Sequence, residues 1–276
     1  MVDDSAEKYG YMDPGHPNYL RWRRSRELSE ERGKFVRSVV ENYTVCRGLT
    51  VLDLGSGEGG TSSVFSEDNS VVSLEISKFK LKRQKSTGTN SLPVCGSALE
   101  LPFKKMKFDL IIMQDVIEHL ADHNNLHLNL YSMLKPGGII FISTPNKFSL
   151  FNILTDPHWG LPFLSLCNRE TIRKYFLRFF RKRDIERNDI AQLLSLNEVR
   201  RLFGGKLVIK LNTKFSVKKL LEGNKGIAWS DFHLSLIRMI NAAGIGKMLM
   251  IFANDDFGIV NNFFNPTFYF IMKKGG

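Results

Sequence analysis

An apolar run that ends in a cluster of glycines constrains the fold of this chain more than any other feature. Residues 51–54 have the β-branched and aliphatic pattern of a buried strand. The strand leads into the sequence GSGEGG at residues 55–60, and a helix is predicted from Thr61. Glycines let such a turn bend tightly, and the first N–H groups of the following helix face a bound ligand. The segment therefore predicts a site for a nucleotide-like cofactor.

The same residues fit two cofactor patterns. Glycines 55, 57 and 60 match the dinucleotide pattern GxGxxG, which alone is a weak signal. Asp53, however, lies inside the end of the strand, where it would repel a pyrophosphate but attract an amino group and a sulfonium. Here the chain resembles the class I S-adenosylmethionine-dependent methyltransferases, whose first motif has this form. The resemblance assigns the methionine end of the cofactor to this turn, namely to Asp53, Gly55, Ser56, Gly57 and Gly59.

The second strand, predicted at residues 71–75, ends in Glu75, which lies 22 residues beyond Asp53. A carboxylate about 20 residues along, at the end of the next strand, can accept hydrogen bonds from both ribose hydroxyls. Glu75 and Ile76 also resemble the acidic second motif of the methyltransferases. We therefore expect these two residues to contact the ribose side of S-adenosylmethionine.

A third short strand is predicted at residues 92–95, and the segment 96–103 after it resembles the family's adenine-binding segment. In the family an acidic residue next to the alanine contacts the adenine amino group, whereas this chain has Ser97 there. The backbone N–H of Ala98 or Leu99 can serve instead. Ser97, Ala98 and Leu99 are thus the predicted adenine contacts.

The clearest buried strand, residues 108–115, leads into the start of a helix at 116–120. Its sequence, with Asp115, Glu118 and His119, resembles small-molecule methyltransferases of the ubiquinone-biosynthesis O-methyltransferase type. Gln114 is expected near the sulfonium, and His119 is a candidate general base, with His158 as its rival. A metal site built from Glu118, His119, His123 and His127 is not predicted, because Glu118 and His119 are expected to point apart and no cysteine joins them.

Alternating strands and helices from about residue 46 to 146 predict a parallel, right-handed, doubly wound α/β sheet. A helix capped by Ser195 or Asn197 and by Gly204, a sixth strand at 206–212 and an antiparallel seventh strand at 267–274 complete a seven-stranded Rossmann-like fold. The predicted organisation is an N-terminal arm and lid helix (1–45), a cofactor-binding core (46–146), a first cap insertion (147–194), core (195–212), a second cap insertion (213–264) and the last core strand (265–276).

Both insertions leave the end of the sheet at which ligands bind, so we expect them to form one helical cap that sets substrate specificity. In the first, residues 170–183 place Ile172, Phe176, Phe179 and Phe180 on one helical face, with basic residues elsewhere. That pattern fits either an interfacial helix on an anionic bilayer or a cap helix packed on protein. Residues 234–253 are apolar but too polar to span a membrane comfortably, which favours cap helices or a second interfacial element.

The formal net charge of +11 favours an anionic partner, which could be a membrane, a nucleic acid or an acidic substrate, and the alternative is a solvated basic surface without a partner. Cys46, Cys95 and Cys167 show no pairing pattern, and residues 1–5 are acidic, which predicts no signal peptide. These features favour a cytoplasmic protein, with association at a membrane surface as a further expectation.

Together the motifs predict an enzyme that uses S-adenosylmethionine to methylate an oxygen of an amphiphilic small molecule, such as a lipid, a prenylated compound or a glycan precursor. The alternatives are an RNA methyltransferase and a catalytically inactive, methyltransferase-like binding subunit. Residues 114–117 read Gln-Asp-Val-Ile, which differs from the Asn/Asp-Pro-Pro-aromatic motif of nucleobase amino-methyltransferases. Asp53 and the later motifs disfavour a nicotinamide-dependent oxidoreductase.

Overall fold

Seven strands form one sheet in the order β3-β2-β1-β4-β5-β7-β6. All neighbours pair in parallel except β7, which is antiparallel to both β5 and β6. The computed structural model describes residues 12–275 apart from 124, 188, 206 and 228–230. The strands are β1 (Thr50–Leu54), β2 (Ser70–Glu75), β3 (Leu92–Cys95), β4 (Phe108–Gln114), β5 (Leu134–Pro145), β6 (Leu207–Leu211) and β7 (Thr267–Lys274). The predicted doubly wound sheet with an antiparallel last strand is confirmed.

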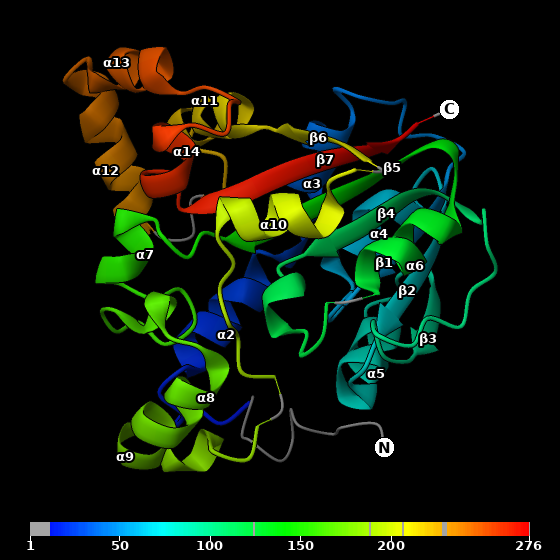
Figure 1. The fold of residues 1–276 in the computed structure, drawn as a ribbon, viewed down its shortest axis with the longest axis horizontal. Helices are drawn as coiled ribbons and strands as arrows, with labels where there is room; N and C mark the ends of the chain where they lie inside the picture. The colour runs from blue at the N-terminus through cyan, green and yellow to red at the C-terminus, as the bar shows by residue number, and fades with distance from the viewer. Residues whose placement is uncertain (1–11, 124, 188, 206, 228–230, 276) are drawn as a thin grey trace.

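Helices cover both faces of this sheet (Figure 1). On one face, α3 (Ser29–Val40) buries Phe35, Val36, Val39 and Val40 against β1, β4 and β5. On the other, α6 (Leu126–Met133) and α10 (Leu196–Phe203) pack their apolar sides on the same strands and on β7. The remaining core helices are α4 (Gly60–Ser66) and α5 (Lys78–Ser86). The two apolar layers follow directly from the alternating pattern along the strands.

Helix α10 begins as predicted at Ser195. The Ser195 side chain accepts from the Glu198 N–H, and the Glu198 carboxylate accepts from the Ser195 N–H at 2.7 Å. This reciprocal capping box satisfies two N–H groups that the helix itself leaves unpaired.

Three local expectations are corrected. The single lid helix expected within residues 1–45 is two helices, α2 (Tyr19–Glu27) and α3, separated at Leu28. The segment after β4 is a single 3₁₀ turn, η1 (Ile117–His119), rather than the start of an α-helix. Residues 134–138, whose Pro-Gly-Gly sequence favours a turn that ends a helix, lie inside β5, with a register shift between Phe108 and Leu110 on the paired strand. In each case contacts to other elements determine the backbone conformation, and the local pattern of apolar residues in the sequence does not contain that information.

The first insertion contains α7 (Leu150–Leu154), η2 (Leu164–Leu166), α8 (Arg169–Thr171), the π-helical η3 (Ile172–Leu177), α9 (Arg178–Phe180) and η4 (Lys182–Asp184). The second contains α11 (Thr213–Leu221), α12 (Asp231–Ala242), α13 (Ile245–Phe252) and α14 (Ile259–Phe263). Figure 1 shows α7, α8, α9, α12 and α13 along one side of the molecule. Within the described chain, no helix is both long and apolar enough to cross a bilayer.

The two insertions differ in what they contact. Residues of the first meet α2, because the Arg21 guanidinium donates to the carbonyls of Asp156 and Pro157. The second insertion contacts α3, because Phe215 of α11 packs near Phe35 of that helix. Both are tied to Asn146, the residue after β5. Its side-chain amide donates to the carbonyls of Asn261, Asn262 and Asn265, and the side-chain amide of Asn152 in α7 donates to its carbonyl.

Candidate functional site

Three glycines of the turn after β1 adopt positive φ, at 75° for Gly55, 58° for Gly57 and 85° for Gly59. A Cβ at Gly55 would lie 2.5 Å from Val116, and one at Gly59 would lie 2.4 Å from Gln84. A Cβ at Gly57 would meet no described atom within 4 Å. Two of the glycines are therefore needed for packing, whereas Gly57 presents bare backbone to open space, where a ligand can approach.

Glu75 lies directly beside this open backbone. Its Oε2 accepts from the Gly57 N–H and its Oε1 from the Ser77 N–H, both at 2.9 Å. The carboxylate is buried at the end of β2, and each oxygen keeps further lone pairs for another donor. Glu75 thus links the glycine turn to the start of α5 and stands at the position expected for a ribose contact.

Asp53 occupies a different position from the rest of the turn, because it faces inward. It is 2% exposed, and its Oδ2 accepts from the Ser62 hydroxyl at 2.6 Å. Ser62 in turn bonds Ser73 at 2.7 Å, and Gln84 donates to Ser73 at 2.8 Å. Burial, followed by the nearby Glu75, raises the pKa of Asp53 to about 6. These hydrogen bonds hold α4 behind the turn, and a contact between Asp53 and the cofactor stays a prediction.

The other predicted cofactor contacts lie at the same edge of the sheet. Ser56 donates to Gln84 at 3.4 Å, and Gln114, at the end of β4, accepts from Thr61 at 2.7 Å. Ile76 follows β2 and is exposed, and Ser97–Leu99 follow β3 and are at least partly exposed. The Leu99 N–H donates to the Ser97 hydroxyl at 3.1 Å, which makes the Ala98 N–H the better candidate for an adenine contact.

Asp115 was not a predicted site residue, yet it anchors the next part of the site. It follows β4 with a φ of 54°, which is uncommon for a residue with a side chain. Its carboxylate accepts from Ser143 at 2.7 Å and pairs with Arg32 of α3. An acid that directly follows a buried strand is the sequence signal that could have found it.

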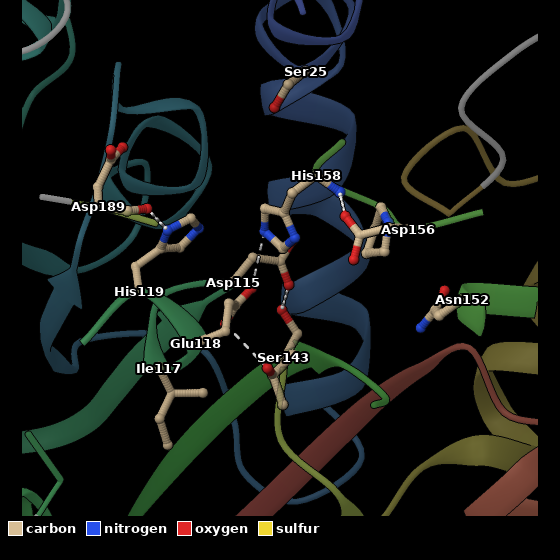
Figure 2. A network of polar contacts seen from close by, with 12 residues as sticks. Ser25, Asp115, Ile117, Glu118, His119, Ser143, Asn152, Asp156, His158 and Asp189 are labelled. Atoms are coloured by element: carbon tan, nitrogen blue, oxygen red, sulfur yellow. Dashed lines mark hydrogen bonds and ion pairs between the residues drawn. The ribbon is translucent and has the colours of Figure 1, made fainter. Parts of the chain in front are cut away.

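His119, His158 and Glu118 converge beyond Asp115 from two separate segments (Figure 2). The rings of the two histidines are 5.0 Å apart and nearly perpendicular. His158 Nε2 lies 3.9 Å from Glu118 Oε1. The structure therefore brings together both predicted catalytic residues, although 39 positions separate them in the sequence.

Each histidine is oriented by a backbone contact. His119 Nδ1 lies 2.7 Å from the Asp189 carbonyl, and because a carbonyl only accepts, Nδ1 carries the proton. The Nε2 lone pair of His119 is therefore available. Asp156 shapes the loop that holds His158, since its Oδ1 accepts from the N–H groups of His158 and Trp159 at 2.8 Å. Arg21 then fastens this loop to α2.

Burial controls the ionisation of all three groups. It raises the pKa of Glu118 to about 8, helped by the nearby charge of Asp115. It lowers the pKa of His119 and lowers that of His158 well below the usual histidine value. Within the described chain, Glu118 Oε1 and His158 Nδ1 are buried without a hydrogen-bond partner. Near pH 7 the cluster therefore holds neutral histidines beside a mostly protonated acid.

The same three side chains have donor atoms within 4.8 Å of one another. The expectation that Glu118 and His119 point apart is thus wrong, because the tight η1 turn and the incoming His158 loop bring them together. His123 and His127 lie outside this group, and His123 Nε2 bonds the Ile117 carbonyl at 2.8 Å. That no metal binds here stays a prediction.

Comparison with known proteins finds similarity to methyltransferases. Residues 52–142 match the model of a family described as a methyltransferase domain. The chain is 29% identical over 105 residues to a probable S-adenosylmethionine-dependent methyltransferase of Mycolicibacterium smegmatis, covering 38% of this chain and 41% of that protein. It is 31% identical over 108 residues to a ubiquinone biosynthesis O-methyltransferase of Chelativorans sp., covering 36% and 42%. The chain therefore spans about two-fifths of the length of these relatives.

The similarity in three dimensions is broader than that in sequence. The plantazolicin methyltransferase in complex with SAH superposes with a TM-score of 0.57 at 14% identity, over 99% of this chain and 95% of the other. At that identity the match establishes the fold. The superposed region therefore spans nearly the whole of this chain.

Proposed function

We propose that the chain is a class I S-adenosylmethionine-dependent methyltransferase and that it methylates an oxygen atom of an amphiphilic small molecule; the methyltransferase domain match over residues 52–142 and the two methyltransferase relatives support the first part. The single observation that carries the choice of oxygen is the cluster of Glu118, His119 and His158. A hydroxyl acceptor must lose a proton as it attacks, and neutral histidines in the site can take it.

The residues at the strand ends fit this cofactor. The bare backbone at Gly57 leaves space beside the Glu75 carboxylate, which a side chain at position 57 would occupy. When bound, S-adenosylmethionine would supply a methyl group carried on a sulfonium sulfur, and in-line attack on that methyl group would release the sulfur as the leaving group. Glu75 would hold the ribose hydroxyls, the Ala98 N–H the adenine, and the Gly55–Gly57 backbone with Gln114 the methionine end.

His119 is the proposed general base. The Asp189 carbonyl fixes its proton on Nδ1, so that Nε2 presents a lone pair. Its lowered pKa keeps it neutral through the physiological range, since a histidine that charges only at lower pH remains able to accept a proton. Glu118, which is mostly protonated at pH 7, and His158 limit the directions from which an acceptor hydroxyl can reach His119.

An amphiphilic acceptor is supported by the composition of the first insertion. The loop that carries His158 continues into exposed Leu161 and Phe163, and α7 before it exposes Phe151 and Leu154. A substrate with an apolar tail would bury such side chains, which a small polar acceptor would leave in water. The three cysteines are free, which supports a reducing, cytoplasmic compartment.

Calorimetric titration with S-adenosylhomocysteine, with NADH as the comparison, tests the cofactor. We expect binding of the first ligand alone, abolished in Gly57→Arg and weakened in Glu75→Gln. Gly88→Arg is a matched control, because Gly88 also has a positive φ of 73° and open space around it. Loss of binding in the control as well would assign the effect to backbone strain, and binding of NADH alone would overturn the proposal.

Transfer of a radiolabelled methyl group to a panel of prenylated phenols, lipid hydroxyls and glycolipids tests the acceptor, with RNA as a parallel arm. We expect label in an organic extract, reduced about a hundredfold in His119→Gln and retained in His127→Gln. Label in RNA would overturn the substrate class. Cofactor binding without transfer to any acceptor would favour a non-catalytic binding subunit.

A further inference from the structure

The helical segment α8-η3-α9 divides its apolar side chains between two environments. Ile172, Phe176 and Leu177 are buried in the cluster that contains Trp159. Tyr175, Phe179 and Phe180, in contrast, are 57%, 68% and 73% exposed. Water-exposed aromatic side chains at adjacent positions are unfavourable unless another surface covers them.

The same segment is strongly basic. Residues 169–183 contain seven Lys or Arg residues and one acid, a net contribution of +6 to the chain's formal charge of +11. Five of the basic residues are exposed around the aromatic rings, and these are Arg173, Lys174, Arg178, Lys182 and Arg183. We refer to Tyr175, Phe179 and Phe180 together with these five residues as the aromatic–basic face.

Further exposed apolar side chains lie on the neighbouring cap elements. In α7, Phe151 is 60% and Leu154 is 67% exposed, and Phe163 at the start of η2 is 63% exposed. The elements α7 and η2 contact each other, and Figure 1 shows them with α8 and α9 on one side of the molecule. The apolar surface thus extends beyond a single helix.

We propose that the aromatic–basic face docks on the surface of an anionic lipid bilayer, with Phe179 and Phe180 inserted at the level of the headgroups. Exposed aromatic side chains with Lys and Arg near them complement such a bilayer. The aromatic side chains match its apolar interior, and the basic side chains match its anionic headgroups. The core of a protein interface is instead depleted in Lys.

The aromatic–basic face is linked to the candidate site through packed side chains. Phe176, on the buried side of the same helical segment, packs edge to face on Trp159 at 5.6 Å, and Trp159 is the neighbour of His158. A bilayer bound at α9 would therefore lie next to the loop that supplies His158. Docking goes beyond the proposed methyl transfer and does not depend on it, since lipid binding is measured without turnover.

The test is co-sedimentation of the full chain with phosphatidylcholine vesicles that either contain or lack phosphatidylglycerol, at low and high salt. We expect binding only with phosphatidylglycerol, weakened by salt. The double variants Phe179→Ser/Phe180→Ser and Arg178→Gln/Lys182→Gln should each weaken partitioning about tenfold or more. Circular dichroism and S-adenosylhomocysteine binding should remain unchanged in both, because the replaced side chains are exposed.

Two matched variants control for loss of exposed apolar groups and of charge in general. Leu92→Ser/Val208→Ser removes similarly exposed apolar residues from β3 and β6, and Lys82→Gln/Lys85→Gln removes two exposed charges from α5. Both should bind vesicles as the unaltered chain does. The proposal is overturned if binding ignores phosphatidylglycerol, if the control variants lose as much binding, or if the face binds RNA but no vesicle.

Discussion

The environment of Glu118 disfavours the ionised form of its carboxyl group. Its side chain is fully buried, one carboxylate oxygen accepts from Thr144 at 3.0 Å, and within the described chain the other has no partner. Such a group costs stability whenever it is ionised. Strongly shifted carboxyl groups in a cleft more often serve function than stability, which makes Glu118 a direct test of the site.

Replacing Glu118 with Gln should stabilise the fold and impair the reaction. The pKa of Glu118 is higher in the folded protein than in the unfolded chain, so Glu118 loses its proton more easily once the protein unfolds. This difference lowers the free energy of unfolding. The loss of stability is absent below the ordinary carboxyl pKa and grows as the pH rises toward about 8. At pH 7 the gain should be roughly 3 kcal/mol. Denaturant unfolding at several pH values measures it.

The gain in Glu118→Gln should shrink toward zero near pH 4, while methyl transfer at pH 7 falls with cofactor affinity intact. Thr144→Val, which removes only the donor to Glu118, is the comparison and should lower stability instead. A Gln variant that is destabilised at every pH would show that the carboxyl group is held in its ionised form.

The position of the polar residues at strand ends could be predicted from the sequence, because the carboxyl ends of parallel strands lie at one edge of the sheet. Glu75 and Gln114 are examples, and both lie there. The partners of these residues could not be assigned. Arg32 reaches Asp115 from a helix 83 positions away, and His158 reaches Glu118 across 40 positions. Such contacts are set by how elements pack, and no local pattern in the chain encodes them.

At the scale of elements, α3 and α4 approach each other closely in the core. A Cβ at Gly33 would lie 2.8 Å from the Thr61 Cα and 3.1 Å from the Gly60 carbonyl. Both are backbone atoms, which cannot rotate away. The helix before β1 is thereby pressed against the helix that follows the glycine turn, so the position of the turn depends on α3.

Gly33→Ala should therefore destabilise the protein, even though alanine favours the helix by about 1 kcal/mol. Overpacking against backbone costs about 1–3 kcal/mol or more, and relief requires α3 and α4 to separate. We expect a lower unfolding midpoint together with weaker S-adenosylhomocysteine binding. Lys34→Ala, at an exposed position of the same helix, should change neither. Full cofactor affinity in Gly33→Ala would show that the turn is independent of α3.

The helices were the less predictable elements for a related reason. The break at Leu28 and the 3₁₀ turn at Ile117–His119 occur in sequences whose apolar spacing suits a continuous helix. Leu28 is buried, and Ile117 is in the main core cluster, so burial of these two side chains sets the backbone there. The strands other than β5, by contrast, match their predicted bounds to within a residue or two, whereas β5 already begins at Leu134.

At the scale of the whole molecule, the N-terminal helices and the first insertion form one unit over the site. Arg21 donates to Asp156 and Pro157 at 3.1 and 2.8 Å, and His16 lies 3.3 Å from Asp184. Arg187 also stacks on Trp22, with its guanidinium carbon 5.4 Å from the ring centre. These contacts join segments more than 130 positions apart, and the role of the N-terminal helices as a lid over the cofactor stays a prediction.

Arg21→Gln should loosen both halves of this unit at once. Amide hydrogen exchange is expected to rise in residues 19–27 and in residues 156–163 together, because each segment opens when the other is released. Arg23→Gln is the control, since Arg23 in the same helix pairs only with the exposed Glu27 in the described structure. Faster exchange confined to one of the two segments would show that they move independently.

The placement of β7 has a consequence for how the chain is made. This strand lies between β5 and β6, pairing with both, yet it is the last of the seven in sequence. Until the ribosome has synthesised residue 274, β5 and β6 each present an unpaired edge, the kind of edge that recruits other chains. All residues of the site precede β7, so the parts that bind cofactor and acceptor are synthesised before the sheet can close.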